Sequence, residues 1–195
     1  MGCGLGCRIS YDENMKIDFC TDKKLFVWPE DNHYFRLALN ELIFKRCPCY
    51  LSEGVVVIDF SFRNVALLIN DEWLKFLSKT DMSIVLISDR RMIAIANYWL
   101  KQSSSIKAII RTDDGIAGFT EELKKILCGR SCIRVKAPAA TAREMHVLSM
   151  ISLGRNTHEI ATKLNCSLKS VYVHKSALKK KMGNDITFHM LSHKY

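Results

Sequence analysis

Short, mostly apolar runs alternate with helical patterns in the first two thirds of this chain. Runs of five to nine such residues are typical of strands that are buried on both faces of a sheet. They occur at residues 24–28, 54–62, 83–89 and 106–112. Helical patterns at residues 31–44, 71–80, 90–101 and 119–130 separate or follow them. This alternation predicts a doubly wound α/β domain with a parallel sheet.

The last third of the chain carries three helical patterns instead of strands. Thr141 with Glu144 three residues on is typical of a capping box, and Gly154 would end the first helix. A short second helix, "THEIATKLN", precedes the tight turn "NCS", after which Ser167 can cap a third helix. A short helix, a tight turn and a further helix form the helix-turn-helix arrangement.

The third helix has two faces that differ in polarity. At 100° per residue, Val171, Leu178 and Met182 fall on one side, where they can pack against the two preceding helices. The opposite side could enter a DNA major groove, which is wide enough to admit a helix. That side carries Lys169, Tyr172, Val173, Ser176 and Lys180. A plain solvated lysine face or a membrane-surface helix would compete with this interpretation, but the narrow apolar stripe disfavours the second.

Charge is distributed unevenly along the 195 residues, whose net charge is +9. Residues 1–133 hold 18 Lys and Arg against 17 Asp and Glu, whereas residues 134–195 hold 11 against 3. The excess positive charge therefore belongs to the helical part. Such asymmetry indicates an acidic partner for that end, most simply double-stranded DNA.

The helical part resembles the LuxR/FixJ/NarL-type (GerE) helix-turn-helix domain over "TAREMHVLSMISLGRNTHEIATKLNCSLKSVYVHKSALKKKMG". The residues that fit the family pattern are Thr141, Arg143, Glu144, Val147, Leu148, Gly154, Glu159, Ile160, Ala161, Leu164, Ser167, Val171, His174, Lys181 and Gly183. Departures are mild: Ser170 replaces Thr, Leu178 replaces Ile, Met182 replaces Leu, Cys166 replaces a larger aliphatic residue, and Tyr172 stands where Lys is frequent.

This resemblance implies roles for individual residues. By position, the base-facing residues would be Tyr172, Val173 and Ser176. Contacts to DNA phosphates would fall on Thr157, Lys169, Ser170, His174, Lys175 and Lys180. A hydrogen bond between helices is the alternative for His174. Lys175, Lys179 and Lys181 would flank the groove, and "NDITFHMLSHKY" would be a short fourth helix, often a dimer surface in the family.

The α/β part resembles a response-regulator receiver domain, because polar residues follow its strands at suitable intervals. They are Glu30, Asp31, Asp59, Ser88 and Arg111. Pro29 intrudes on the acidic pair, Arg111 replaces a lysine, and the interval from Glu30 to Asp59 is too short for a full set of elements. We therefore expect a missing strand–helix unit and an incomplete Mg²⁺ site. Asp59 is a possible phospho-acceptor, and local hydrogen bonding of Asp59 and Ser88 is the alternative.

The pattern predicts four segments along the chain. Residues 1–22 are expected to be disordered or to precede a true start at Met15, and residues 23–133 form the degenerate receiver-like domain. Residues 134–140 are the linker, and residues 141–195 are the LuxR-type DNA-binding domain. No signal-peptide core or membrane-length apolar run occurs, so we expect a cytoplasmic, nucleoid-associated protein without a membrane partner.

Little in the sequence indicates catalysis. The eight cysteines, at positions 3, 7, 20, 47, 49, 128, 132 and 166, show no CxxC spacing, so reduced thiols are expected and a metal or redox site is the alternative. No nucleophile–base pair, ligand cluster or phosphate-binding loop is present. We expect a protein that is not an enzyme and that needs no cofactor or metal.

A degenerate receiver joined to this helix-turn-helix is similar to enterobacterial accessory regulators of fimbriae and capsule, of the EcpR, RcsA and RmpA kind. The resemblance implies a transcription factor, most simply an activator of surface-structure or virulence genes. Its partners would be DNA, RNA polymerase, and a second copy or a related response regulator such as RcsB. Two alternatives remain: a phosphorylation-responsive regulator that uses Asp59, and a protein-interaction adaptor that modulates another regulator.

Overall fold

The computed structural model of the protein describes residues 25–46, 54–127 and 137–183. Residues 1–22, seven of the eight cysteines and the expected fourth helix lie outside these ranges. Within them, no helix is long and apolar enough to cross a membrane.

In the described part of the first domain, four parallel strands form a sheet. They are β1 (Leu25–Trp28), β2 (Val55–Phe60), β3 (Ser83–Ser88) and β4 (Ile106–Arg111), and they lie side by side in the order β1-β2-β3-β4. All six residues of β2 are buried, as its continuous apolar run predicts. The prediction of a parallel α/β domain is confirmed. The second run was expected to continue to residue 62, but the strand ends at Phe60 and a 3-10 turn, Phe62–Asn64, follows.

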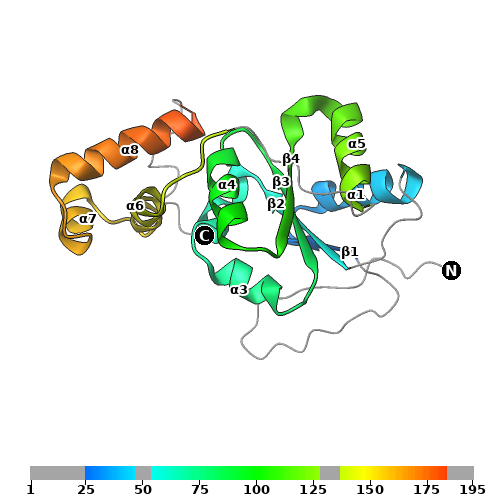
Figure 1. Ribbon diagram of the computed structural model, residues 1–195, viewed down its shortest axis with the longest axis horizontal. Helices are drawn as coiled ribbons and strands as arrows, with labels where there is room; N and C mark the ends of the chain where they lie inside the picture. Colours follow the sequence, from blue (N-terminus) through cyan, green and yellow to red (C-terminus); the bar gives the residue numbers. More distant parts are fainter. Residues whose placement is uncertain (1–24, 47–53, 128–136, 184–195) are drawn as a thin grey trace.

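Helices cover both faces of this sheet (Figure 1). One face carries α1 (His33–Arg46) and α5 (Gly115–Leu127), which contribute Leu39 and Leu123 to one core. The other face carries α2 (Val65–Leu68), α3 (Glu72–Ser78) and α4 (Ile93–Gln102). Helix α2 was not predicted, and α5 begins four residues before the predicted start at Phe119.

The connection from β1 to β2 has an unusual hand. The chain moves in one direction across the sheet, yet α1 lies on the face opposite to α3 and α4. Its crossover therefore has the hand opposite to that of the β2–β3 and β3–β4 crossovers, although such connections are almost always right-handed. Removing the second strand and its following helix from the order 2-1-3-4-5 would leave this topology. The arrangement agrees with the missing strand–helix unit that the short interval from Glu30 to Asp59 predicts.

Between residues 137 and 183, the second domain has three helices: α6 (Ala142–Ser152), α7 (Thr157–Lys163) and α8 (Leu168–Met182). Thr141 and Glu144 make the predicted capping box, and Ser167 caps α8. Gly154 has φ +74°, the left-handed conformation that favours glycine at a helix end. A second capping box, Asn156 with Glu159, fixes the start of α7.

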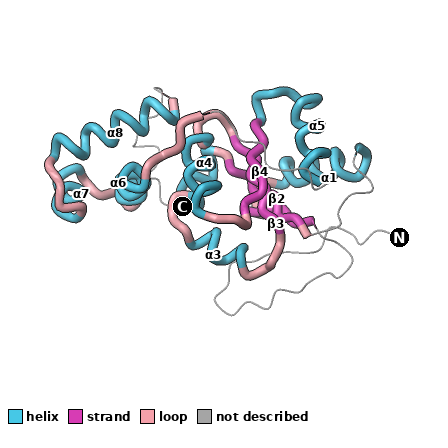
Figure 2. The backbone as a smooth tube through the Cα atoms, in the orientation of Figure 1, coloured by secondary structure: helices cyan, strands magenta, loops and turns pink. Residues whose placement is uncertain are grey.

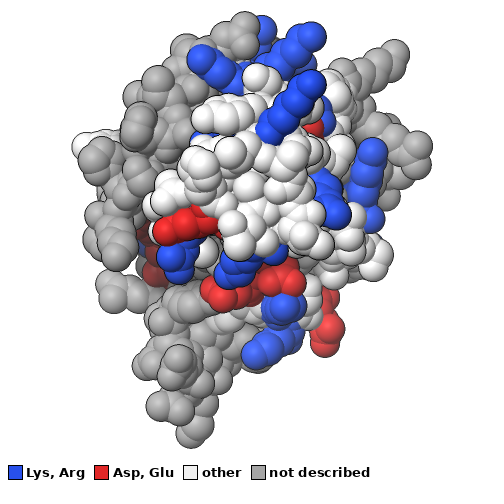
Figure 3. Space-filling view, turned by 90° about the vertical axis from the view of Figure 1, so that its left-hand side faces the viewer, with Lys and Arg blue, Asp and Glu red and all other residues white. Residues whose placement is uncertain are grey.

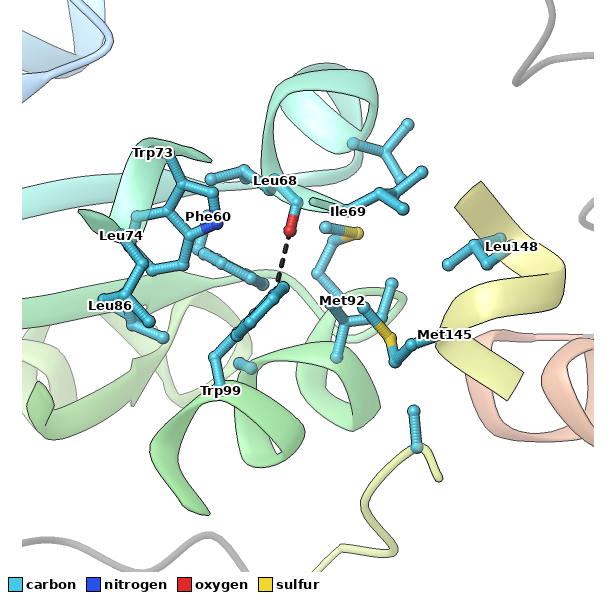
Figure 4. Close-up of a cluster of buried hydrophobic side chains, with 14 of the residues drawn as sticks. Phe60, Leu68, Ile69, Trp73, Leu74, Leu86, Met92, Trp99, Met145 and Leu148 are labelled. Carbon is cyan, nitrogen blue, oxygen red and sulfur yellow. Dashed lines mark hydrogen bonds between the residues drawn. The ribbon is translucent and has the colours of Figure 1, made fainter. Parts of the chain in front are cut away.

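The two domains share one continuous hydrophobic core. Figure 4 shows this cluster running from Trp73 and Trp99 past Met92 to Met145 and Leu148 of α6. Each indole of the cluster is packed against another aromatic ring, and Trp99 Nε1 donates a hydrogen bond to the Leu68 carbonyl at 2.9 Å. Burial of this apolar surface therefore holds the helical domain against α4 as well as holding the sheet domain together.

Residues 137–140, expected as part of a linker, are hydrogen-bonded along α4. The Ala140 amide donates to the Ala94 carbonyl at 2.8 Å, and Asn97 Nδ2 donates to the Ala137 carbonyl at 2.9 Å. Figure 2 shows this loop passing beside α4 before α6 begins. The junction in these four residues is thus fixed by backbone and side-chain hydrogen bonds.

Candidate nucleic-acid interface

Helix α8 is seated on α6 and α7 by its apolar face. Val171 and Leu178 are fully buried and Met182 is 1% exposed, as the helical spacing predicts. Ala161 of α7 is small and buried, so α7 and α8 can approach closely. The Cys166 amide donates to the Ala161 carbonyl at 3.0 Å and so closes the turn between the two helices. The opposite face of α8 is consequently turned away from the protein.

We call that outward surface the reading face; it comprises Lys169, Tyr172, Val173, Ser176 and Lys180, and all five are exposed. Tyr172 is 60% exposed and Val173 is 58% exposed, which is unusual for apolar side chains on a helix with such a well-buried inner face. The structure therefore brings the three predicted base-facing residues together on one open surface.

The residues predicted to contact phosphate do not share one environment. Lys169 and Lys180 are exposed at the two ends of the reading face. Lys175 Nζ donates to Thr157 Oγ1 at 3.0 Å, which ties the start of α7 to α8. Ser170 is engaged in the helix cap, since its amide donates to Ser167 Oγ at 3.1 Å.

His174 is half-buried, and its ring makes no hydrogen bond in the part of the chain that the structure describes. Among the described residues, His174 therefore does not form the hydrogen bond between helices that was the alternative to a phosphate contact. Its contact with phosphate stays a prediction.

Lys181 was expected to flank the groove, and this expectation is wrong. Its ammonium group points into the domain, donating to Glu144 Oε2 at 2.7 Å, to Glu144 Oε1 at 3.0 Å and to the Ala139 carbonyl at 3.0 Å. Burial raises the pKa of Glu144, but hydrogen bonds from Lys181 and the Thr141 amide outweigh it, so this pKa lies below its ordinary value. Lys181 therefore joins the end of α8 to the start of α6 and to the junction.

Charged side chains border an uncharged area on this end of the molecule. Figure 3 shows lysine and arginine side chains above and to the right of a white surface, and acidic side chains mixed with basic ones to its left and below it. The basic part of this border suits a polyanion, because its cations can meet phosphates while the uncharged centre is free for the groove.

The ends of the sheet strands carry a different kind of polar cluster, here called the carboxyl edge: Glu30, Asp31, Asp59, Ser88 and Arg111. Asp59 is only 3% exposed, and its Oδ2 accepts a hydrogen bond from Asn32 Nδ2 at 2.8 Å. Ser88 is fully buried and its hydroxyl donates to the Asp89 carbonyl. Both hydrogen bonds are of the kind expected if Asp59 and Ser88 serve the fold and do not take part in phosphorylation.

Arg111, which stands where the receiver pattern has lysine, is directed to Asp113. The two make a two-point ion pair, and the hydrogen bond from Arg111 lowers the pKa of Asp113. Arg63 lies 3.7 Å from Asp31. Among the described residues, no three His, Cys, Asp or Glu side chains gather as a metal site.

Comparison with known proteins identifies both parts. Residues 1–127 match the family model described as EcpR N-terminal domain, and residues 140–185 match "Bacterial regulatory proteins, luxR family". The chain belongs to the EcpR N-terminal domain family. With its luxR-family domain, this EcpR-family chain is a LuxR-type DNA-binding regulator, and that family is one of transcription regulators rather than enzymes.

Several known proteins are similar to this chain over most of its length. "Uncharacterized protein YqeH" of Escherichia coli strain K12 is 32% identical over 184 residues, which is 94% of this chain and 88% of that protein. A structure of two RcsB dimers bound to two parallel DNAs is similar over 81% of this chain and 90% of that one, with 16% identity and a TM-score of 0.48. A structure of full-length FixJ from B. japonicum is similar over 86% of this chain and 92% of the FixJ chain, with 17% identity and a TM-score of 0.36.

Three structural contacts of this EcpR-family chain were not predicted from its sequence. The box of Asn156 and Glu159 has the right spacing and was detectable. The pairing of Asn32 with Asp59 and that of Lys181 with Glu144 span 27 and 37 residues, so no local pattern could reveal them.

Proposed function

We propose that this chain is a sequence-specific transcription factor that places the reading face of α8 in the major groove. The observation that carries the proposal is an outward face with Tyr172, Val173 and Ser176 at its centre and lysines at its ends. Base-edge contacts would come from the central residues, and phosphate contacts from Lys169, Lys180, Lys175, Thr157, Ser170 and His174.

Binding of the purified full-length chain to promoter DNA tests this proposal. We expect retardation of duplexes from the regulator's own upstream region in a gel shift at low salt, with log K falling linearly as log salt rises. Replacing Lys169 by Ala should weaken binding to every duplex, whereas replacing Lys124, an exposed lysine of α5, should not. If neither the chain alone nor its mixture with an RcsB-type partner retarded DNA, the proposal of a DNA-binding transcription factor would be contradicted. The alternative of a protein-interaction adaptor would then be favoured.

We also propose that Asp59 is structural rather than a phospho-acceptor. Its burial, its bond from Asn32 and the diversion of Arg111 to Asp113 support this role. An acceptor would need an accessible carboxylate, a bound Mg²⁺ and a free cation for the phosphoryl group. Incubation with acetyl phosphate and Mg²⁺, followed by intact-mass analysis, checks it: an added phosphoryl group that Asp59→Asn abolishes would restore the response-regulator alternative.

The remaining proposals concern partners and targets. We propose that two copies, or one copy and a related response regulator such as RcsB, bind adjacent half-sites. The chain would act in the cytoplasm on the nucleoid, with RNA polymerase, as an activator of surface-structure genes. Support comes from the family and from the similarity to fimbrial and capsular regulators. Sedimentation with and without DNA tests the stoichiometry, and genome-wide binding with transcript levels tests the targets.

A further inference from the structure

The N-terminal half of α8 presents apolar side chains to solvent where a recognition helix meets base edges. Leu168 is 37% exposed, Tyr172 60% and Val173 58%. Leu168 and Tyr172 are four residues apart and so lie on adjoining turns of one face, with Val173 beside them. Three exposed apolar residues in the first two turns form a continuous patch that does not serve the fold, because the buried face is formed by other residues.

The centre of the reading face lacks the side chains that read purines by two hydrogen bonds. The sequence of α8, LKSVYVHKSALKKKM, contains no Arg, Asn or Gln. Arg or Lys can read guanine, and Asn or Gln can read adenine, through paired contacts in the major groove. The two lysines of the reading face, Lys169 and Lys180, stand at its ends. The central residues, Tyr172, Val173 and Ser176, therefore offer direct readout through apolar contact and one hydroxyl group.

The feature that an apolar side chain recognises in the major groove is the C5-methyl group of thymine. We infer that Tyr172 and Val173 read thymine methyl groups, so that the operator half-site is specified by the positions of thymines on either strand. This inference rests on the proposed function, and it adds the chemical class of base that the reading face selects. The bordering lysines then hold the helix in the groove without choosing the sequence.

Replacing thymine by deoxyuridine tests the inference, since it removes the methyl group and keeps the pairing edges. Duplexes enriched from a random-sequence library by the full-length chain are synthesised in thymine and uracil forms, and Kd is measured by fluorescence anisotropy. Burial of one methyl group corresponds to about a fourfold change in Kd, so the uracil form should bind about fourfold more weakly for each contacted methyl.

Two variants separate readout from general binding. Val173→Ala should weaken binding to the thymine form and leave the uracil form nearly unchanged, so the ratio of the two Kd values falls. Lys169→Ala should weaken both forms by the same factor and keep the ratio. An unenriched duplex in its two forms serves as the control for any effect of uracil on DNA shape, with an expected ratio of one.

The results of these binding measurements distinguish failure of methyl readout from failure of the proposed DNA-binding function. Enriched duplexes that bind equally well in both forms would overturn methyl readout while leaving sequence-specific binding intact. The same holds if Val173→Ala keeps the full thymine-to-uracil ratio. Failure to enrich or bind any duplex would overturn the proposed function itself, and methyl readout with it.

Discussion

The reading face of α8 and the carboxyl edge of the sheet are both recognisable from family motifs, yet they differ in what their side chains touch. The reading face directs its residues to solvent, with Val173 58% exposed. The carboxyl edge keeps Asp59 and Ser88 buried and satisfied by Asn32 and Asp89. A motif residue can bind a partner only when its side chain is exposed and not already hydrogen-bonded within the fold. Equally good matches to family motifs therefore indicate a binding role at the reading face and a structural role at the carboxyl edge.

The largest expected effect is on stability, and it tests whether the lysine of α8 that points into the protein has a structural role that the exposed lysines lack. Lys181→Met would leave Glu144 buried without its cation, and we expect the free energy of unfolding to fall by about 3 kcal/mol in urea titrations. The matched control is Lys179→Met, an exposed lysine on the same helix, which should change stability by less than about 0.5 kcal/mol. Similar losses in both variants would contradict the inward role of Lys181.

The same pair predicts a pH dependence. Because the pKa of Glu144 is lowered in the folded state, its contribution is present above the ordinary glutamate value of about 4.3 and is lost as pH falls through the folded pKa. Lys181→Met removes the hydrogen bonds from Lys181 that lower this pKa, while burial and the hydrogen bond from the Thr141 amide remain, so the Glu144 carboxyl is protonated more readily than in the wild type. The stability gap between the wild type and this variant should therefore narrow on acidification below about pH 4.

The next effect concerns the border of the reading face. The double variant Lys169→Ala, Lys180→Ala should raise Kd for all duplexes by about one to two orders of magnitude at low salt. If each lysine meets one phosphate, the slope of log K against log salt should become shallower by about 1.8. Anisotropy titrations across a salt series measure both quantities. An unchanged slope would show that these two ammonium groups do not meet phosphate.

A smaller effect tests the carboxyl edge. Asn32→Ala removes the donor to Asp59 Oδ2 and the acceptor of the Phe35 amide at the start of α1, and should lower the free energy of unfolding by about 1 to 2 kcal/mol. DNA affinity should stay within about twofold of the wild type, because the edge is not expected to carry a signal. Asp59→Asn, the isosteric control, should likewise leave affinity unchanged. A large loss of DNA binding in either stable variant would mean that the edge controls the reading face.

The smallest effect tests the centre of the reading face. Ser176→Ala should change the preference between an enriched duplex and single-base variants of it by about threefold, while binding to unenriched DNA stays the same. A competition series over single-base substitutions provides the measurement. If Ser176→Ala weakened binding to every duplex equally, Ser176 would be assigned a contact with the DNA backbone instead of the bases.

The elements whose deciding contacts are local could be predicted from the sequence. The capping box of Thr141 and Glu144, the cap at Ser167 and the buried stripe of Val171, Leu178 and Met182 all follow from spacing within one helix. The four strands followed from continuous apolar runs. Which polar partner each buried carboxylate would find depended on contacts between distant segments, so Lys181 was placed on the wrong side of its helix.

The hand of the β1–β2 connection and the shared core lay equally beyond local patterns. The apolar pattern of a helix tells which of its own sides is buried, not which face of a sheet it covers, so the sequence of α1 does not set the hand of its crossover. Met92 and Met145 are consistent with burial in separate cores or in a common one, and the packing of the two domains against each other joins them.

The hydrogen bonds that fix the junction to α4 have a consequence for operator geometry. The Ala140 amide and Asn97 fix the described residues of the junction to α4, so these hydrogen bonds restrict movement of the reading face relative to the sheet domain. Two copies joined through their sheet domains would then present two α8 helices at one set separation and one set rotation. Inserting five base pairs between half-sites turns the second half-site by roughly half a helical turn, so such a dimer would tolerate almost no variation in spacing.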